Sequence, residues 1–222
     1  AKRTSKGARD AQRQAESYAD GLEHLTGHAP VIFLTNGHEI WIWNRKAEEV
    51  KRTLFGYYSR DSLEYLIEKN RESAKLLYQV KPEVYETIAD RPYQIEAIKR
   101  IGERFDQKQR KALLVQATGT GKTRVAVALS KVMIHAKRAK RVLFLCDRKE
   151  LRKQAKDAFE YHLPTEPVVY LKRSTYKDKS NRIYIATYPA MIQFFQSFDV
   201  GFFDLIIADE SHRSIYNRYR DL

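Results

Sequence analysis

Residues 112–129 read ALLVQATGTGKTRVAVAL, an apolar run followed by a glycine-rich turn and an amphipathic stretch. The run at 112–116 predicts a buried β-strand, and residues 122–136 predict a helix. Glycine at positions 119 and 121 lets the backbone curl around an anion without a clash from Cβ. This order of strand, turn and helix is typical of a phosphate-binding loop.

The chemistry of such a loop lies in the backbone N–H groups at the start of the helix, which face phosphate oxygens. Lys122 adds a positive charge, and the hydroxyl of Thr123 is a ligand for Mg²⁺. The general pattern GxxxxGK[ST] has a glycine where this chain has Gln116, so the match is partial. A simple glycine turn is the alternative interpretation.

The rest of the second half alternates helical patterns with short apolar runs. Continuous Val, Ile and Leu runs indicate strands covered on both faces, as in a parallel sheet. We therefore predict an α/β fold with a mostly parallel sheet. The expected strands are 142–146, 168–171, 183–187 and 205–209, and the expected helices are 92–106, 122–136 and 149–161.

An acidic pair, Asp209 and Glu210, ends the last of these runs in LIIADESH. Ligands bind at the carboxyl ends of strands in open α/β sheets. Asp209 and Thr123 predict a Mg²⁺ site, because this ion takes few protein ligands and keeps its waters. Glu210 is then placed to orient the attacking water. An acidic pair alone is usually only a strand-end turn, so the prediction requires the two segments to converge.

The first part of the chain has a different pattern. Apolar residues at three-to-four spacing predict a helix over 10–25, and VIFLTNGHEIWIWN predicts a hairpin with a type I′ turn at Asn36 and Gly37. We place the domain boundary so that residues 1–78 form one part and residues 79–222 the other.

Composition limits the function classes. The 222 residues hold 41 Lys and Arg against 28 Asp and Glu, a net charge of +13. This surplus favours a nucleic-acid partner, with a merely basic surface as the alternative. Cys146, the one cysteine, excludes a disulfide framework and fits a reducing cytoplasm. No apolar run approaches the roughly 18 residues of a membrane span, so we expect no membrane partner.

The motifs ATGTGKT and DESH resemble motifs I and II of superfamily 2 helicases and translocases, with DESH in the place of a DEAH box, and RPYQIEAI resembles their adenine-reading Q motif. The resemblance implies a RecA-like lobe that binds ATP and Mg²⁺, with Lys122, Asp209 and Glu210 as catalytic residues. Gln94 would read adenine, assisted by Arg91 or Tyr93. The implied cradle for the phosphates is Thr118, Gly119, Thr120, Gly121, Lys122 and Thr123.

Two further segments resemble DNA-contacting motifs of the same superfamily. LFLCDRKELRKQ is similar to motif Ia and IATYPAM to the motif that follows it, which implies that Arg148 and Thr187 lie near the DNA backbone. Cationic and hydroxyl groups bind phosphates without reading sequence. The basic runs at 137–141 and 172–182 are either a DNA-facing rim or solvated loops.

DESHRSIYNRY and the NGHEIWIWN hairpin together resemble the motor subunit of type I restriction enzymes. In that family a PD-(D/E)xK nuclease domain precedes the motor. The resemblance assigns Lys2, Gln14 and Tyr18 to a remnant of that nuclease, without the carboxylates that hold its metal. It also implies double-stranded DNA and the methylation and specificity subunits as partners.

This resemblance makes the chain a piece of a longer motor, ending before the second lobe that supplies an arginine finger. Such an arginine is worth about 10³ to 10⁵ in turnover, so we expect weak nucleotide binding and negligible hydrolysis by the chain alone. Two alternatives stay open. One is another superfamily 2 helicase or a type III restriction motor, and the other is a non-catalytic, nucleotide-gated DNA-binding module.

Overall fold

The computed structural model describes residues 8–47, 50–71, 77 and 80–210. The chain divides into two compact units. Unit 1 is Ala1–Ser73 with the short segment Asp199–Phe202, and unit 2 is Ala74–Phe198 with Phe203–Leu222. The assignment of residues 1–78 to a nuclease remnant and 79–222 to a motor lobe stays a prediction.

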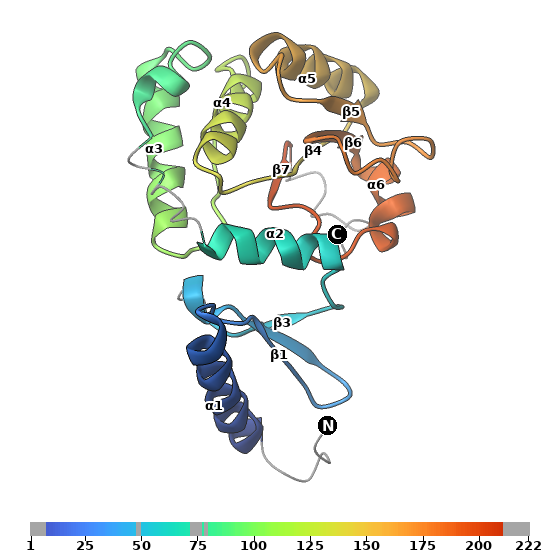
Figure 1. Ribbon diagram of the computed structural model, residues 1–222. Helices are drawn as coiled ribbons and strands as arrows, with labels where there is room; N and C mark the ends of the chain where they lie inside the picture. The colour runs from blue at the N-terminus through green and yellow to red at the C-terminus, as the bar shows by residue number, and fades with distance from the viewer. Residues whose placement is uncertain (1–7, 48–49, 72–76, 78–79, 211–222) are drawn as a thin grey trace. The chain divides into compact units, whose positions relative to one another are not determined.

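Unit 1 combines a long helix, a small antiparallel sheet and a second helix (Figure 1). Its strands pair in the order β1-β2-β3, and Ile42 in the central strand is almost fully buried. The elements are α1 (Ala8–Thr26), β1 (Ile32–Thr35), β2 (Ile40–Trp43), a short 3₁₀ helix (Arg45–Ala47), β3 (Arg52–Leu54) and α2 (Arg60–Arg71).

The predicted hairpin is confirmed, but its type I′ turn is wrong. Four residues, 36–39, connect β1 and β2, and among them only Gly37 has a positive φ, of 92°. The side chain of Asn36 accepts hydrogen bonds from the amides of His38 (3.0 Å) and Glu39 (2.8 Å). Because this side chain closes the turn itself, the backbone needs no second residue of positive φ.

Unit 2 is built on four parallel strands in the order β5-β6-β4-β7. The predicted α/β class is confirmed. The strands are β4 (Val142–Cys146), β5 (Val168–Tyr170), β6 (Ile183–Thr187) and β7 (Leu205–Ala208). The helices are α3 (Pro92–Asp106), α4 (Lys122–His135), α5 (Lys149–His162) and α6 (Tyr188–Phe194), with 3₁₀ turns at Pro82–Val84 and Phe195–Ser197.

Burial differs between the centre and the edges of this sheet. Every residue of β4 and β6 is buried, as continuous apolar runs predict. The edge strands depart from the predicted coverage on both faces, since Ile206 in β7 is 54% exposed and β5 is only half-buried. The sheet therefore has a fully covered middle and open margins.

The predicted strand at 112–116 is wrong. These residues form no strand, and Leu113 and Val115 are 81% and 85% exposed. A strand forms only where a neighbour accepts its backbone hydrogen bonds. Among the described residues, the edge strand β7 pairs with β4 alone, and residues 112–116 pair with no strand.

The helices pack in sequence against one another and against the sheet (Figure 1). Helix α3 packs on α4, α4 packs on α5, and α5 packs on β4, β5 and β6. The carboxylate of Asp106 closes the end of α3, where it accepts hydrogen bonds from Arg138 (2.6 Å) and from the amide of Leu77 (3.1 Å). Within the described residues, no helix is both long and apolar enough to cross a bilayer.

Candidate nucleotide-binding site

The glycine-rich turn has the conformation that a phosphate-binding loop requires. Gly119 and Gly121 have φ values of 81° and 87°, a region that side chains rarely adopt. A Cβ at position 119 would meet no atom within 4 Å, so the loop is open on that side. The hydroxyl of Thr120 donates to the carbonyl of Ala117 (2.7 Å) and closes the turn from within, while Thr118 is exposed.

Helix α4 begins directly after this loop. Gly121 is its N-cap residue, and no side chain caps the first turn. The first N–H groups of a helix have no partner within the helix, and they carry the positive end of its dipole. The start of α4 therefore suits a phosphate, with Lys122 and Thr123 as its first two residues.

The start of α3 holds the loop from the other side. The carbonyl of Thr120 accepts hydrogen bonds from the amide nitrogen of Gln94 (2.8 Å) and from the hydroxyl of Tyr93 (3.0 Å). Arg91 donates in turn to the Tyr93 hydroxyl at 2.8 Å. A Cβ at Gly121 would lie 2.5 Å from the side-chain nitrogen of Gln94, and the φ of 87° is one that residues with a Cβ rarely adopt, so glycine suits this position.

Gln94 is 1% exposed, and its Oε1 is buried without a hydrogen-bond partner. A buried acceptor left unpaired is unfavourable, and such groups are few in native structures. The predicted adenine contact therefore has one free atom, Oε1, because the nitrogen is already bound to the loop. An adenine contact of Gln94 and Arg91 stays a prediction.

The acidic pair lies against the loop, as the convergence of the two motifs requires. Lys122 Nζ and Glu210 Oε1 are 2.7 Å apart, although 88 positions separate the residues. Glu210 has a φ of 53°, uncommon for a residue with a side chain. The backbone of Asp209 is fixed on both sides, since its N–H donates to the carbonyl of Leu145 (2.8 Å) and its carbonyl accepts from the hydroxyl of Tyr188 (2.9 Å).

The electrostatics of this pair suit a cation. Burial raises the pKa of Asp209 above its usual value, with Lys122 opposing and Glu210 adding to the shift. The hydrogen bond to Glu210 raises the pKa of Lys122, so the ammonium stays charged. A half-buried carboxylate whose negative charge is incompletely compensated fits a hard cation with oxygen ligands. With Thr123 at the start of α4, the residues present fit Mg²⁺ together with a triphosphate.

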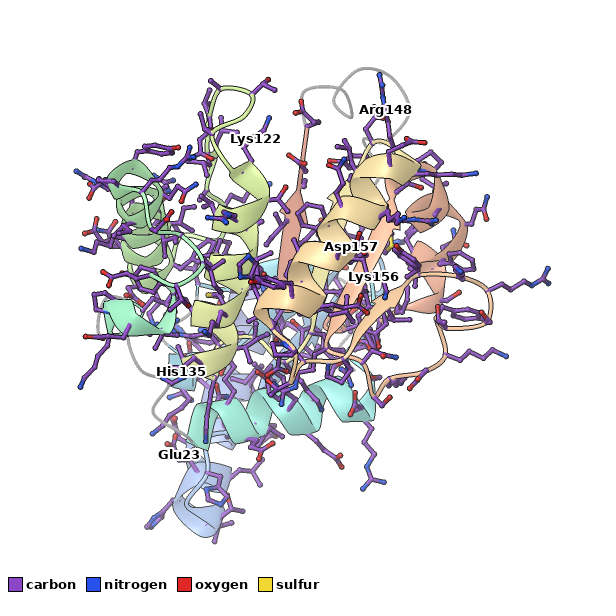
Figure 2. All side chains as sticks on the ribbon, turned by 90° about the horizontal axis from the view of Figure 1, so that it is seen from above. Glu23, Lys122, His135, Arg148, Lys156 and Asp157 are labelled. Carbon is purple, nitrogen blue, oxygen red and sulfur yellow. The ribbon has the colours of Figure 1, made fainter. Side chains whose placement is uncertain are left out.

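The residues predicted to contact DNA have different local roles. Arg148 is the exposed N-cap residue of α5, with its guanidinium 3.7 Å from Asp147. Figure 2 shows Arg148 and Lys122 at the starts of α5 and α4, toward the same end of unit 2. Thr187 is 9% exposed, and its hydroxyl caps α6 by accepting from the amide of Ala190 at 3.4 Å. The DNA contacts of both residues stay predictions.

The residues predicted for the nuclease remnant belong to unit 1. Gln14 and Tyr18 lie one turn apart on α1, and the Gln14 amide donates to the Tyr18 hydroxyl at 2.6 Å. Tyr18 is 64% exposed. Lys2 lies outside the described residues, so the nuclease assignment stays a prediction.

The sequence reasoning missed Tyr188 and gave Tyr93 a different role. Tyr188 holds the backbone at Asp209, and its position directly after the run at 183–187 is the signal that could have suggested it. Tyr93 was expected to assist the base, and the structure shows its hydroxyl on the phosphate loop instead.

Most of the chain is similar in sequence to known proteins. The family described as "Type III restriction enzyme, res subunit" matches residues 87–222. The endonuclease subunit of the type I restriction enzyme EcoKI from Escherichia coli K12 is 29% identical over 205 residues, which are 83% of this chain and 17% of that protein. The corresponding EcoAI subunit from Escherichia coli is 36% identical over 129 residues, or 55% of this chain and 16% of that protein.

Two solved structures are also similar. A fragment assigned as an HsdR subunit of a type I restriction enzyme from Vibrio vulnificus YJ016 is 26% identical, with a TM-score of 0.45, over 98% of this chain and 40% of that one. A Sulfolobus solfataricus SWI2/SNF2 ATPase core in complex with double-stranded DNA is 22% identical, with a TM-score of 0.48, over 55% of this chain and 26% of that one.

The chain thus spans less than a fifth of the length of either curated relative. These relatives confirm the resemblance to type I restriction subunits that the motifs predicted. Since the family match extends over residues 87–222, well over half of the sequence, the chain belongs to the restriction-enzyme family described as the type III res subunit.

Proposed function

We propose that this chain forms the nucleotide-binding part of an ATP-dependent motor that moves double-stranded DNA in a type I restriction enzyme. The observation that carries the proposal is the 2.7 Å contact between Lys122 and Glu210. It brings the glycine-rich loop and the acidic pair into one site, as a triphosphate bound with Mg²⁺ requires.

Each residue of the site has a proposed task. Lys122 and the first N–H groups of α4 bind the phosphates, and Thr123 with Asp209 holds Mg²⁺. When bound, the magnesium nucleotide supplies the phosphoanhydride bond whose hydrolysis drives movement. Glu210 orients the attacking water. Its Oε1 pairs with Lys122 in this structure, and its second carboxylate oxygen is the one proposed to accept from the water.

The partners follow from the relatives and stay part of the proposal. EcoKI and EcoAI are type I restriction enzymes, and the relatives are their endonuclease subunits. By analogy we propose double-stranded DNA and the methylation and specificity subunits as partners, in the cytoplasm. The net charge of +13 supports a polyanionic partner.

The first test is nucleotide binding by the purified chain. A fluorescent ATP analogue with Mg²⁺ should bind, and Lys122→Ala should weaken binding about 10- to 100-fold, because it removes a charged hydrogen bond of about 1.5–3 kcal/mol. Lys131→Ala is the matched control, since Lys131 lies on the same helix about two and a half turns further on. Equal affinities of the Lys122 and Lys131 variants would contradict the proposed site.

Turnover is a separate test. As the family resemblance led us to expect, steady-state release of phosphate by the chain alone should be negligible, since an arginine finger in such motors is worth about 10³ to 10⁵ in turnover. A measurable rate that disappears in Lys122→Ala would refute this expectation while supporting the nucleotide site. Absence of nucleotide binding by the unmodified chain would refute the nucleotide site itself.

A further inference from the structure

A cluster of positive charge lies at the edge of the sheet that is farther from the nucleotide site. Three cations face the ring of Tyr170, the last residue of β5. The guanidinium carbon of Arg152 is 4.6 Å from the ring centroid, Nζ of Lys156 is 5.4 Å away, and Nζ of Lys172 is 5.5 Å away. Strands β6 and β4 separate β5 from β7, which carries the acidic pair.

Helix α5 continues this cluster as a stripe. Lys149, Arg152, Lys153 and Lys156 follow one another at spacings of three, one and three, which places all four on one side of the helix. Like charges at these spacings repel and destabilise a helix. The N-terminal half of α5 also carries the positive end of the helix dipole, which favours acidic residues there. The stripe therefore opposes the stability of its own helix.

Few acids in the described part of the chain compensate this charge. Lys156 pairs with Glu160 one turn later. No carboxylate among the described residues pairs with Arg152 or Lys172, and the Nε of Arg152 is buried without a hydrogen-bond partner. Stacking on Tyr170 holds the guanidinium of Arg152 in place and leaves its positive charge without an acidic partner among the described residues. Such an arrangement is suited to an external anion.

The length of the stripe indicates the kind of anion. The seven steps from Lys149 to Lys156 span about 10 Å of helix, at 1.5 Å per residue. A DNA strand carries a phosphate every 3.4 Å or so along the axis, so the stripe can face several successive phosphates of one strand. A single small phosphate compound would meet only part of it. Figure 2 shows Arg148 at the start of α5 and Lys156 further along the same helix.

We infer that Arg152, Lys156 and Lys172, arranged around Tyr170, form a second binding surface for the phosphate backbone of double-stranded DNA. We call it the Tyr170 surface. It extends along α5 beyond Arg148 and binds without reading base sequence. The choice of DNA over other polyanions rests on the proposed function, whereas the cationic surface itself does not.

The test compares two double variants of the full 222-residue chain that lose the same charge. Arg152→Gln with Lys172→Gln removes two cations of the Tyr170 surface. Lys81→Gln with Lys99→Gln removes two exposed lysines elsewhere in unit 2 and is the matched control. Binding of a labelled 20-base-pair duplex is measured by fluorescence anisotropy at several salt concentrations.

We expect the slope of log Kd against log salt to fall by about 1.8 in the first variant, or 0.9 for each lost phosphate contact, and to stay near the unmodified value in the control. Tyr170→Leu should weaken DNA binding more than Tyr170→Phe, which keeps the ring. Equal slopes in the two double variants would overturn the inference, because net charge alone would then explain binding. Tighter binding of an RNA duplex than of DNA would overturn it as well.

Nucleotide binding by the same variants separates this inference from the proposed function. The Tyr170 surface variants should bind the ATP analogue like the unmodified chain, since β6 and β4 lie between the surface and the acidic pair. Unchanged nucleotide affinity with a reduced salt slope supports the inference. Loss of nucleotide affinity in Arg152→Gln with Lys172→Gln would overturn it, because the effect would then be general.

Discussion

At the residue scale, the carbonyl of Thr120 connects the two halves of the nucleotide site. It accepts hydrogen bonds from both Gln94 and Tyr93, so the start of α3 fixes the backbone of the phosphate loop. A base that engages Oε1 of Gln94 would act on the side chain that holds this loop. If Gln94 reads adenine, as the resemblance implies, this one side chain would connect base recognition to phosphate binding.

Tyr93→Phe tests this connection, since it removes one hydroxyl and keeps the ring. The variant should bind the ATP analogue about 2- to 10-fold more weakly, because a net hydrogen bond contributes about 0.5–1.5 kcal/mol. Tyr161→Phe, on an 80% exposed side chain of α5, is the control and should bind like the unmodified chain. Unchanged affinity in Tyr93→Phe would show that Gln94 suffices to hold the loop.

The sequence predicts which segments form this site better than it predicts the hydrogen bonds between them. The motifs ATGTGKT and DESH predicted that the glycine-rich turn and the acidic pair converge, and the 2.7 Å contact between Lys122 and Glu210 agrees with this. The burial of Gln94 and the hydroxyl contact of Tyr93 could not be predicted in the same way. They depend on how closely α3 approaches a loop 26 positions away, which is decided by packing across the whole unit.

At the element scale, the packing of α4 on α5 controls a titrating group. His162, the last residue of α5, has its pKa lowered by burial first and then by the charges of Arg124 and Lys131 on α4. The neutral imidazole is therefore the favoured form in the folded chain. Burying the neutral imidazole of His162 contributes stability that is fully present above the ordinary pKa of histidine. This contribution is lost as the pH falls through the lowered pKa of His162.

NMR titration of His162 checks this prediction. The pKa should lie below the ordinary value for histidine, and Arg124→Gln should move it upward, because one of the two cations is then absent. Unfolding free energies measured between pH 7.5 and 5 should fall less for His162→Gln than for the unmodified chain. A His162 pKa above the ordinary value would contradict the described packing.

Most elements of unit 2 were predictable because their patterns are local. The helix at 92–106 and the strands at 142–146 and 183–187 have the predicted bounds. The run at 112–116 has an equally apolar pattern, yet it forms no strand, because pairing depends on a neighbour and not on the run itself. The turn at Asn36 was also mispredicted. The hydrogen bond that its side chain accepts closes the turn without the positive φ that a type I′ turn needs at this residue.

At the scale of the whole molecule, the centre of the sheet is the best-protected part of unit 2. Cys146 ends β4, which has hydrogen-bonded neighbours on both sides, and its side chain is fully buried. Burial raises the pKa of this thiol to about 11. At pH 8 only about one thiol in a thousand is then ionised, and the thiolate is the reactive form.

This protection predicts a simple assay of folding. The thiol of Cys146 should resist a disulfide reagent such as DTNB in native buffer and react fully once urea unfolds unit 2. Its reaction with rising urea should follow the loss of helical circular dichroism. Rapid modification in native buffer would show that β4 opens without unfolding of the unit.

The open margin of β7 affects how the chain behaves at high concentration. Among the described residues this strand pairs only with β4, and its residue Ile206 is 54% exposed. Leu113 and Val115, elsewhere in the same unit, are 81% and 85% exposed. Unpaired strand edges beside apolar side chains promote aggregation between molecules. Concentrated solutions of the chain should therefore self-associate, and a charged residue in place of Ile206 should delay this without altering the nucleotide site.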